Sequence, residues 1–533
     1  MSDVRIASSS NADQSMNVSY NILQEPCSSV AMRGRTLIVN RRLAAAMDKC
    51  KVSDRDAIHL LSACVESLLL NPMDYVINRF SIRRARQQYR EDTAINIQAE
   101  FEQLNVDFAV VHWDTKLLPS VTGIKKQNRL PVIVKTLLTE QLLGVPLISS
   151  GSGKEISNAV FNTLQKWDLV IKVQAFVFNT TSSNTGRFNG ACTLLEMKLG
   201  RNILFLACRH HIFELVLQAA MSSVKLYSSS GPDIPLFKKS KVSFPKINSQ
   251  TISNCDTSNE LVELIAENQE ETHLFCLRIL KNNQEPRHDY TELLDLVVIL
   301  LGGTVPKGNK IRKPGAYHQA RWMPKAIYSI KIFLLRSKFA IIGVKEKALC
   351  KICGFIVVNY IKPWFTANKT TEAPRNDILL LKNLNKYKKR CYNEPVLFSL
   401  FDFNVPLEEK PRMTEKLRKL INSKEIEDVE DEDLTPKKYL LPYDELNEFL
   451  EKDLPCSLIT KRSLNLFKHF KISTSFIESD ANEWSHNVSF NKGKEVCNSI
   501  NVVNDTAERR VKLMEEFNTA FTKNEHQKQI ILQ

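Results

Sequence analysis

The sequence has few of the features that mark secreted or membrane proteins. Its twelve cysteines are scattered through 533 residues without a short, regular spacing, and the polar start of the chain contains no recognisable secretory signal. A disulfide scaffold is therefore not expected, and the thiols are expected to be reduced and intracellular. The sequence also lacks a run of about 18 apolar residues, which argues against a membrane span.

The sequence has fewer acidic than basic residues. The chain has 59 Asp and Glu against 73 Lys and Arg, which gives a formal net charge of +14. Such a surplus favours a polyanionic partner such as DNA over an acidic small molecule. Basic residues concentrate in three clusters that would suit separate phosphate contacts, at 79–90, 307–313 and 382–390. In the first, Arg83, Arg84 and Arg86 are candidate nucleic-acid-binding residues; the alternative for each cluster is a solvated helix face.

Length and composition limit the possible domain organisation. The hydrophobic share of 43% and charged share of 25% are typical of globular proteins, and the length allows about two to four domains. Polarity and apolar spacing predict five segments: a disordered tail at 1–35, a basic helical element at 36–100, an α/β segment at 101–225, a mainly helical insertion at 226–490 and C-terminal helices at 491–533 that complete the core. Ser53 is expected to cap a helix. A like-charge run near 425–435 is expected to be a solvated linker.

The order of elements in the α/β segment is informative. Three strands are expected first, at 106–114, 130–137 and 142–148. They are followed by helix 155–167, strand 170–178, helix 190–199, strand 203–207 and a helix from residue 212. This order predicts a mixed sheet with helices on its faces, as in a ribonuclease H-like core, although other α/β folds remain open.

The ends of two expected strands carry residues that suit metal chemistry. Phosphoryl transfer on DNA uses divalent ions held by carboxylates, because the ions neutralise charge on the attacking and leaving oxygens. In a ribonuclease H-like sheet, the carboxylates lie on the first strand, at the end of the fourth and on a late helix. Asp114 closes the first expected strand, with Lys116 close behind. The alternative for Asp114 is a strand-ending residue that caps a turn.

Four later segments, in order along the chain, resemble those of hAT-like DDE transposases. They are AFVFNTTSSNTGRFNGAC at the end of the fourth strand, FLACRHHIFELVL with Cys208 and His211, YHQARWMPKAIYS with Arg321 and Trp322, and VVNDTAERRVKLMEEFN with Glu508. In that family an Asp, small polar residues and an Asn follow the fourth strand. The resemblance spans roughly residues 105–520. It implies that positions 114, 179 and 508 form the catalytic metal site and that the Arg-Trp pair contacts DNA ends.

Each of these segments also has an ordinary interpretation. Cys208 and His211 suit a packing and hydrogen-bonding motif at a helix start, because tetrahedral zinc needs four ligands. The Arg-Trp pair is equally compatible with a buried Trp beside a surface Arg. Glu508, next to two arginines, is equally compatible with a surface ion pair.

The sequence departs from the family at two points. Asn179 stands where the second Asp is expected, and its neutral amide supplies no charge to hold two cations close together. The alternative for Asn179 is a residue that opens a polar turn. The N-terminal zinc-binding BED module is also absent. Cys350 and Cys353 form the one Cys-x-x-Cys, in an apolar helical context that favours packing.

These observations predict a fold of the α/β plus all-α class, a ribonuclease H-like mixed sheet interrupted by a large helical insertion. The predicted function is that of a transposon-derived, nuclear, homo-oligomeric DNA-binding protein, with Mg²⁺ or Mn²⁺ as cofactor if it is active, no zinc and no membrane partner. Catalysis is expected to be weak or absent because of Asn179. Two alternatives stay open: a non-catalytic interaction or dimerisation protein with the same fold, and an active nuclease that uses Asp168 or Glu196.

Overall fold

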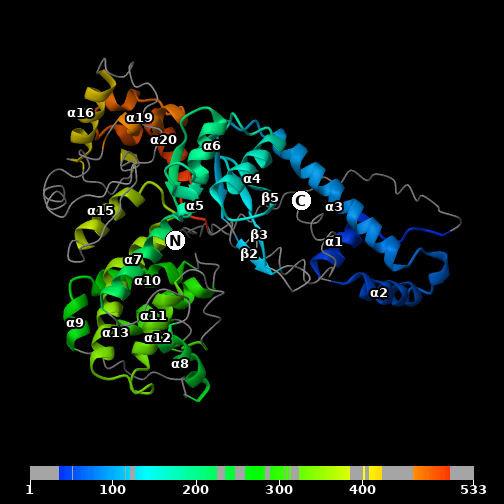
Figure 1. Ribbon diagram of the computed structural model, residues 1–533, viewed down its shortest axis with the longest axis horizontal. Helices are drawn as coiled ribbons and strands as arrows, with labels where there is room; N and C mark the ends of the chain where they lie inside the picture. Colours follow the sequence, from blue (N-terminus) through cyan, green and yellow to red (C-terminus); the bar gives the residue numbers. More distant parts are fainter. Residues whose placement is uncertain are drawn as a thin grey trace, which may run out of the picture. The chain divides into compact units, whose positions relative to one another are not determined.

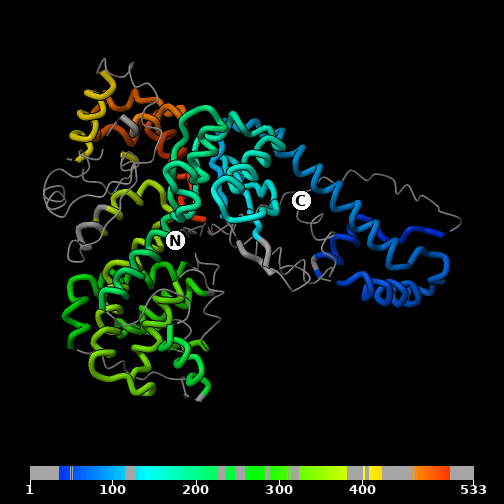
Figure 2. Tube along the Cα trace, viewed as in Figure 1, coloured from blue at the N-terminus to red at the C-terminus, as the bar shows by residue number. Residues whose placement is uncertain are grey.

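The structure is a computed structural model of the chain (Figures 1 and 2). It describes residues 35–50, 52–114, 116–119, 126–224, 234–246, 259–282, 288–305, 308–309, 311–313, 323–384, 400–401, 407, 409–422, 459 and 461–504. The chain folds as two compact units, Met1–Ala94 and Ile95–Gln533. The tail before residue 35, the linker near 425–435 and the segment from residue 505 lie outside the described residues.

The first unit is helical. It contains α1 (Arg41–Lys49), α2 (Asp54–Ser67), the short 3₁₀ helix η1 (Pro72–Asp74) and the first part of α3 (Arg79–Glu102). The expected cap is confirmed, because the Ser53 hydroxyl accepts a hydrogen bond from the Asp56 amide at 3.1 Å. The apolar sides of the helices meet in a small core that includes Val39, Met47, Ala57 and Ile82.

The second unit contains a five-stranded mixed sheet. Its strands are β1 (Ala109–Trp113), β4 (Val132–Lys135), β5 (Glu140–Gly144), β7 (Val173–Phe178) and β8 (Leu204–Ala207), in the spatial order β5-β4-β1-β7-β8. β4 is antiparallel to both of its neighbours, whereas β1, β7 and β8 are parallel. The chain is therefore of the mixed α/β class, as predicted.

The predicted third strand, 142–148, is wrong as a single element. β5 ends at Gly144, and β6 (Leu147–Ile148) belongs to a second sheet of order β2-β3-β6 with β2 (Lys116–Pro119) and β3 (Lys126–Arg129). Pro146 lies between β5 and β6 and has no backbone N–H to donate to a ladder, so pairing stops there. The strands β2 and β3 were not predicted, because each has only four residues and neither KLLP nor KQNR shows apolar alternation.

Different helices cover the two faces of the main sheet. Because side chains alternate along a strand, Val111 and Trp113 face one cluster, which includes α4 (Gly153–Lys166) and α6 (Ala191–Leu199). Val110 and Val177 face the other cluster, built with α19 (Lys461–His469), the 3₁₀ helices η7 (Ser475–Glu478) and η8 (Trp484–His486), and α20 (Val488–Ser499). Residues from near the C-terminus therefore pack on a sheet made by residues 109–207.

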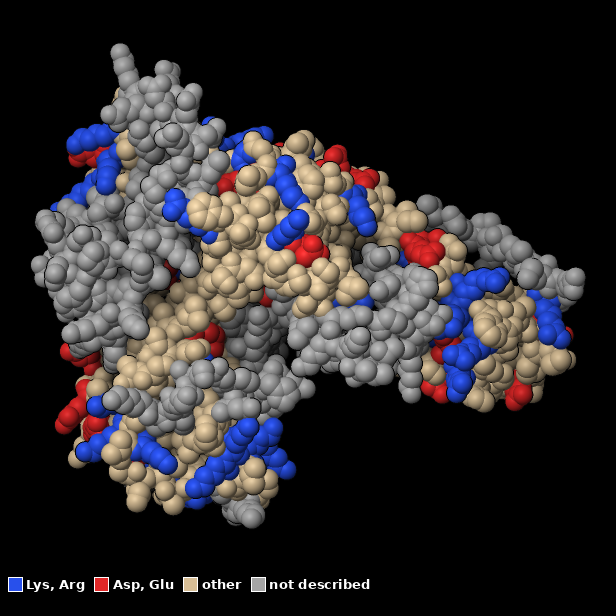
Figure 3. All heavy atoms as spheres, in the orientation of Figure 1, with Lys and Arg blue, Asp and Glu red and all other residues tan. Residues whose placement is uncertain are grey.

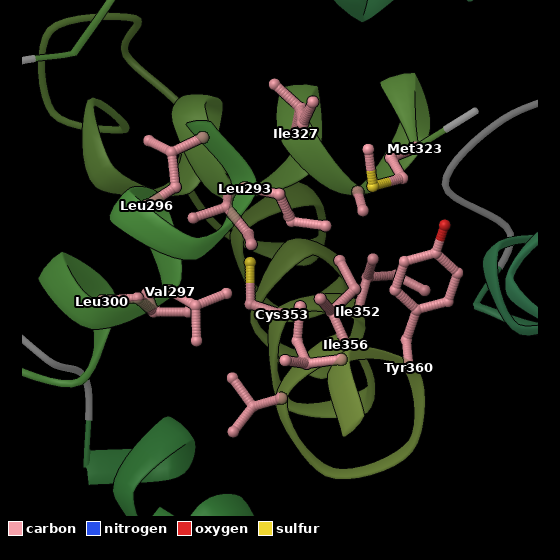
Figure 4. Close-up of a cluster of buried hydrophobic side chains, with 14 of the residues drawn as sticks. Leu293, Leu296, Val297, Leu300, Met323, Ile327, Ile352, Cys353, Ile356 and Tyr360 are labelled. Atoms are coloured by element: carbon pink, nitrogen blue, oxygen red, sulfur yellow. The ribbon is translucent and has the colours of Figure 1, made fainter. Parts of the chain in front are cut away.

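After β8 the described residues form no further strand. The helices are α7 (Arg209–Ser223), α8 (Pro235–Ser243), α9 (Asn259–Ile265), α10 (Gln269–Lys281), α11 (His288–Leu300), α12 (Pro324–Leu334), α13 (Val344–Phe355), α14 (Ile361–Thr366), α15 (Ala373–Leu384) and α16 (Glu409–Asn422). A π-helical turn, Ile356–Tyr360, joins α13 to α14. Figure 4 shows the apolar core between these helices, with Cys353 among Leu293, Ile352 and Ile356. Cys353 is fully buried there.

One helical stretch of the described residues, Val344–Thr366, is long and apolar enough to cross a membrane by length and composition. Within the protein, 83% of its most apolar window is buried against other helices. A high buried fraction is the property of a core helix in a globular protein.

Candidate functional site

Asp114 and Asn179 meet at one edge of the main sheet. Asp114 follows β1 and Asn179 follows β7, and because these strands are parallel neighbours, their carboxyl ends lie at the same edge. The Asn179 side-chain nitrogen, Nδ2, donates a hydrogen bond to Asp114 Oδ1 at 2.9 Å. Both residues are buried, with exposed fractions of 1% and 4%. Two positions that are 65 residues apart in the sequence are thus brought into direct contact.

The orientation of the Asn179 amide is fixed by its other partners. Its Oδ1 accepts hydrogen bonds from the Thr181 amide at 3.3 Å, from the Thr181 hydroxyl at 2.6 Å and from Asn184 Nδ2 at 2.8 Å. A backbone N–H can only donate, so the oxygen must face Thr181 and the nitrogen must face Asp114. The amide oxygen therefore points away from the Asp114 carboxylate. A pair of Mg²⁺ or Mn²⁺ ions needs oxygen ligands on both sides, and this edge does not fit them.

Asn184 locks the same edge from the following turn. It lies in the short helix α5 (Ser182–Thr185) and is completely buried. Its Nδ2 also donates to the Asn179 backbone carbonyl at 3.1 Å, and its Oδ1 accepts from the Trp113 indole nitrogen at 3.0 Å. Asn184 thus ties β1 to β7. Sequence reasoning gave it no role, although the Asn that follows the fourth strand in the resembling family was the available signal.

A close helix contact supports this turn. Gly153 begins α4, and a Cβ atom built there would lie 2.0 Å from the Asn189 carbonyl oxygen and 2.7 Å from the Ser183 carbonyl oxygen. Backbone atoms cannot approach a methyl group that closely, so only glycine allows α4 to pack against the turn that carries Asn184.

We expect Gly153→Ala to destabilise the second unit by roughly 1–3 kcal/mol, because the turn or α4 must shift to admit the methyl group. Thermal unfolding of the purified chain measures this. Gly151→Ala is the matched control, since a Cβ atom there meets nothing within 4 Å and the change should stay within about 0.5 kcal/mol. Equal stability of the two variants would contradict the close approach.

His112 and Asn504 form a second buried pair beside Asp114. Asn504 Nδ2 donates to the Trp113 carbonyl oxygen at 3.1 Å, and Asn504 Oδ1 lies 3.1 Å from His112 Nδ1. Burial lowers the pKa of His112 to about 4; the contact with Asn504 opposes this shift and the charge of Lys135 adds to it. The imidazole is therefore neutral at physiological pH. Neither residue was singled out from the sequence, which gives no sign that they meet.

Three residues of the resembling motifs fall outside the described residues: Glu508, Arg321 and Trp322. Two described residues lie close to them in the sequence. Asn504, four positions before Glu508, is held beside Asp114 by its contact with the Trp113 carbonyl. Met323, which directly follows Trp322, donates its backbone N–H to Glu214 of α7 at 2.8 Å.

The start of α7 is a structural junction. Cys208 directly precedes the helix, is fully buried, and donates its backbone N–H to the Phe178 carbonyl at 2.7 Å. His210 stacks on Trp364 with ring centroids 4.0 Å apart, and the buried Arg209 pairs with Asp377. His211, in contrast, is partly exposed. Among the described residues, no group of three or more His, Cys, Asp or Glu could hold a metal ion together.

Glu214 joins α7 to two other helical elements. Besides Met323, its carboxylate accepts a hydrogen bond from the Tyr360 hydroxyl at 2.6 Å; Figure 4 shows the Tyr360 ring at the margin of the apolar cluster, on the side where Met323 lies. Burial raises the pKa of Glu214, against the opposing effects of these hydrogen bonds and of Lys325. Glu214 thus anchors the start of α12 to α7.

We expect Glu214→Ala to lower the free energy of unfolding by roughly 1–3 kcal/mol, because two donors lose their acceptor. Glu214→Gln keeps an acceptor and is the control. A carboxyl group whose folded pKa is raised contributes most below its unfolded pKa, and this contribution is lost as pH rises through the folded pKa. Glu214→Gln should therefore gain stability relative to wild type as pH rises from about 4 to neutrality. Urea unfolding at several pH values tests this, and a gain on acidification would contradict it.

The three candidate arginines of the first basic cluster do not share one environment. Arg84 is exposed and Arg83 is partly exposed. Arg86 is 1% exposed, and its guanidinium pairs with Asp48 at 2.6 Å and Asp54 at 2.8 Å. The candidate DNA contact of Arg86 is thereby corrected to a structural role, because a phosphate cannot reach a guanidinium committed inside the unit.

The carboxylates proposed for an alternative nuclease lie at the other end of the parallel strands. Asp168 is exposed in the turn before β7 begins. Glu196 accepts a hydrogen bond from the Ile203 amide, just before β8 begins, at 2.8 Å. Asp114 and Asn179 instead follow the ends of their strands, so neither carboxylate shares their edge. The sequence matches no protein-family model and no curated protein.

Proposed function

We propose that this chain is a transposon-derived DNA-binding protein whose ribonuclease H-like core carries a disabled strand-transfer site. The observation that carries the proposal is the hydrogen bond from Asn179 Nδ2 to Asp114 Oδ1. It joins the two strand-end positions expected to share catalytic metal ions, with an amide donor in place of the second carboxylate.

The sheet supports the fold part of the proposal. Ranked by position in the chain, its strands lie in the order 3-2-1-4-5, with the second strand antiparallel to the first. This is the arrangement of ribonuclease H-like cores, in which the first and fourth strands bring their carboxyl ends together. Asp114 and Asn179 occupy those two ends.

The chain returns to the same edge of the sheet after the helical region. Asn504 Nδ2 donates to the carbonyl oxygen of Trp113, the residue before Asp114. Met323, the residue after the Arg-Trp pair, donates its backbone N–H to Glu214 of α7, the helix that follows β8. This contact connects the helical region to the sheet.

The charge balance supports DNA as the partner. Lys and Arg gather in several separate patches on the face shown in Figure 3. The exposed Arg84 and partly exposed Arg83 supply charges on α3. Separate basic patches suit a long polyanion that contacts more than one part of the protein, and we place such a protein in the nucleus.

DNA binding is tested by titrating the chain with duplex DNA at several salt concentrations. We expect affinity to fall steeply with salt, and the salt slope to fall by about one for each phosphate-contacting arginine removed, as in Arg84→Ala. Salt-insensitive or absent binding would instead support the alternative of a non-catalytic interaction or dimerisation protein.

Loss of catalysis is tested by comparing cleavage of DNA ends by wild type and Asn179→Asp in Mg²⁺ or Mn²⁺. We expect no cleavage by the wild type and a gain in the variant, because only the variant has two carboxylates at this edge. Efficient cleavage by the wild type would overturn the proposal that the site is disabled.

A further inference from the structure

We propose that His112 and Asp114 together bind a single divalent transition-metal ion. This goes beyond the proposed function, because it needs neither DNA nor a second carboxylate at position 179. The inference rests on the geometry of the sheet edge.

The spacing of His112 and Asp114 suits binding of one metal ion by both side chains. His112 lies on β1, opposite Ile133 of β4 and Val177 of β7, and Asp114 is two positions later, directly after the strand ends at Trp113. In extended chain, positions two apart have Cα atoms roughly 6–7 Å apart and share a face. That spacing allows an imidazole and a carboxylate to reach one ion.

The hydrogen bonds fix which imidazole nitrogen could bind the ion. Asn504 Nδ2 donates to the Trp113 carbonyl, so Asn504 Oδ1 faces His112 Nδ1. An oxygen there requires Nδ1 to carry the proton, which leaves the lone pair on Nε2. Metal-binding histidines are held in this way, by one ring N–H donated to an oxygen acceptor.

The burial of His112 Nε2 supports a bound cation independently of the spacing between His112 and Asp114. His112 is 5% exposed, and among the described residues its Nε2 has no hydrogen-bond partner. A buried lone pair without a donor costs free energy. A cation at Nε2 would satisfy it, and the carboxylate of Asp114 would supply negative charge.

The ligand types select the ion. A neutral imidazole nitrogen beside a carboxylate suits Mn²⁺ or Co²⁺, whereas Mg²⁺ strongly prefers an all-oxygen shell. Lys135 opposes binding, because its charge acts on the same imidazole. Two protein ligands leave further positions on the ion for water.

The test is a Co²⁺ titration of the full-length chain after metal removal, followed by visible absorption. We expect one equivalent bound through nitrogen and oxygen, without the thiolate charge-transfer bands that cysteine ligands produce. His112→Gln should weaken this component at least about tenfold, and Asn504→Ala about 10–100-fold. Asn504→Asp keeps an oxygen acceptor for Nδ1 and should retain binding.

Two further variants keep the test decisive. Lys135→Met should tighten Co²⁺ binding, since it removes a repelling charge, and it stays informative if His112→Gln does not fold. His59→Gln is the matched control, because His59 is exposed on α2, and it should change nothing. The proposal fails if His112→Gln titrates like the wild type, if Lys135→Met leaves affinity unchanged, or if equimolar Mg²⁺ displaces the Co²⁺.

Discussion

Asn179→Asp is expected to destabilise the metal-free protein by roughly 3–5 kcal/mol, the cost typical of an uncompensated buried charge. The Asn179 nitrogen lies 2.9 Å from Asp114 Oδ1 and donates to it; an aspartate there replaces this donor with a second acceptor. Two carboxylates so close cannot both ionise easily, so the pKa of one is raised. The loss of stability should appear in thermal unfolding at neutral pH.

The same variant should respond to pH and to cations in defined directions. A carboxyl group with a raised folded pKa favours folding at acidic pH, and that contribution is lost as pH rises through the folded pKa. Asn179→Asp should therefore approach wild-type stability on acidification. A divalent cation should also restore it, by about 2.7 kcal/mol at a concentration one hundred times the dissociation constant.

Asn184→Asp is a control for a buried charge in the same turn, away from Asp114. It should lose stability at neutral pH without recovering in Mg²⁺. If Asn179→Asp were as stable as wild type in EDTA, or unresponsive to Mg²⁺, the two strand ends would not form a latent cation site.

Arg86→Ala is expected to unfold much of the first unit, with a loss of roughly 3–5 kcal/mol. The Arg86 guanidinium is buried between α1 and α2 and pairs with both Asp48 and Asp54. Its removal leaves two carboxylates with fewer partners in a unit whose apolar core is small. Hydrogen exchange of α1 and α2 measures the effect directly, because the second unit is an internal reference.

Arg84→Ala separates this structural role from DNA binding. Arg84 is exposed on the same helix, so its removal should change stability by less than about 0.5 kcal/mol while it weakens DNA binding. Arg86→Lys should lose most of the stability that Arg86→Ala loses, since an ammonium cannot bridge two carboxylates as a guanidinium does. Unchanged exchange in Arg86→Ala would place Arg86 on the surface instead.

Helix α7 connects the candidate site to other parts of the second unit through Arg209. Arg209 donates its backbone N–H to the Val502 carbonyl at 3.1 Å and its side chain to the Ala373 carbonyl at 2.8 Å. Arg209 therefore links α7 to the helical region and to the segment that contains Val502 and Asn504. A substitution that moves Arg209 should therefore also affect the sheet edge, because these contacts connect the two.

The sequence by itself determined the mixed α/β class, the approximate places of four of the five main strands and the cap at Ser53. These follow from local signals: apolar alternation, helical periodicity and a hydroxyl residue before an acidic turn. It also singled out Asp114 and Asn179, because both come at the ends of expected strands and match positions of the resembling family.

Only the tertiary structure decided what those two residues do to each other. The direction of the Asn179 amide depends on Thr181 and Asn184, and the tautomer of His112 depends on Asn504, almost 400 positions away. The sequence also could not reveal that Arg86 is buried between Asp48 and Asp54. Such contacts arise from the packing of distant segments, and residue type and spacing carry no record of which donor meets which acceptor.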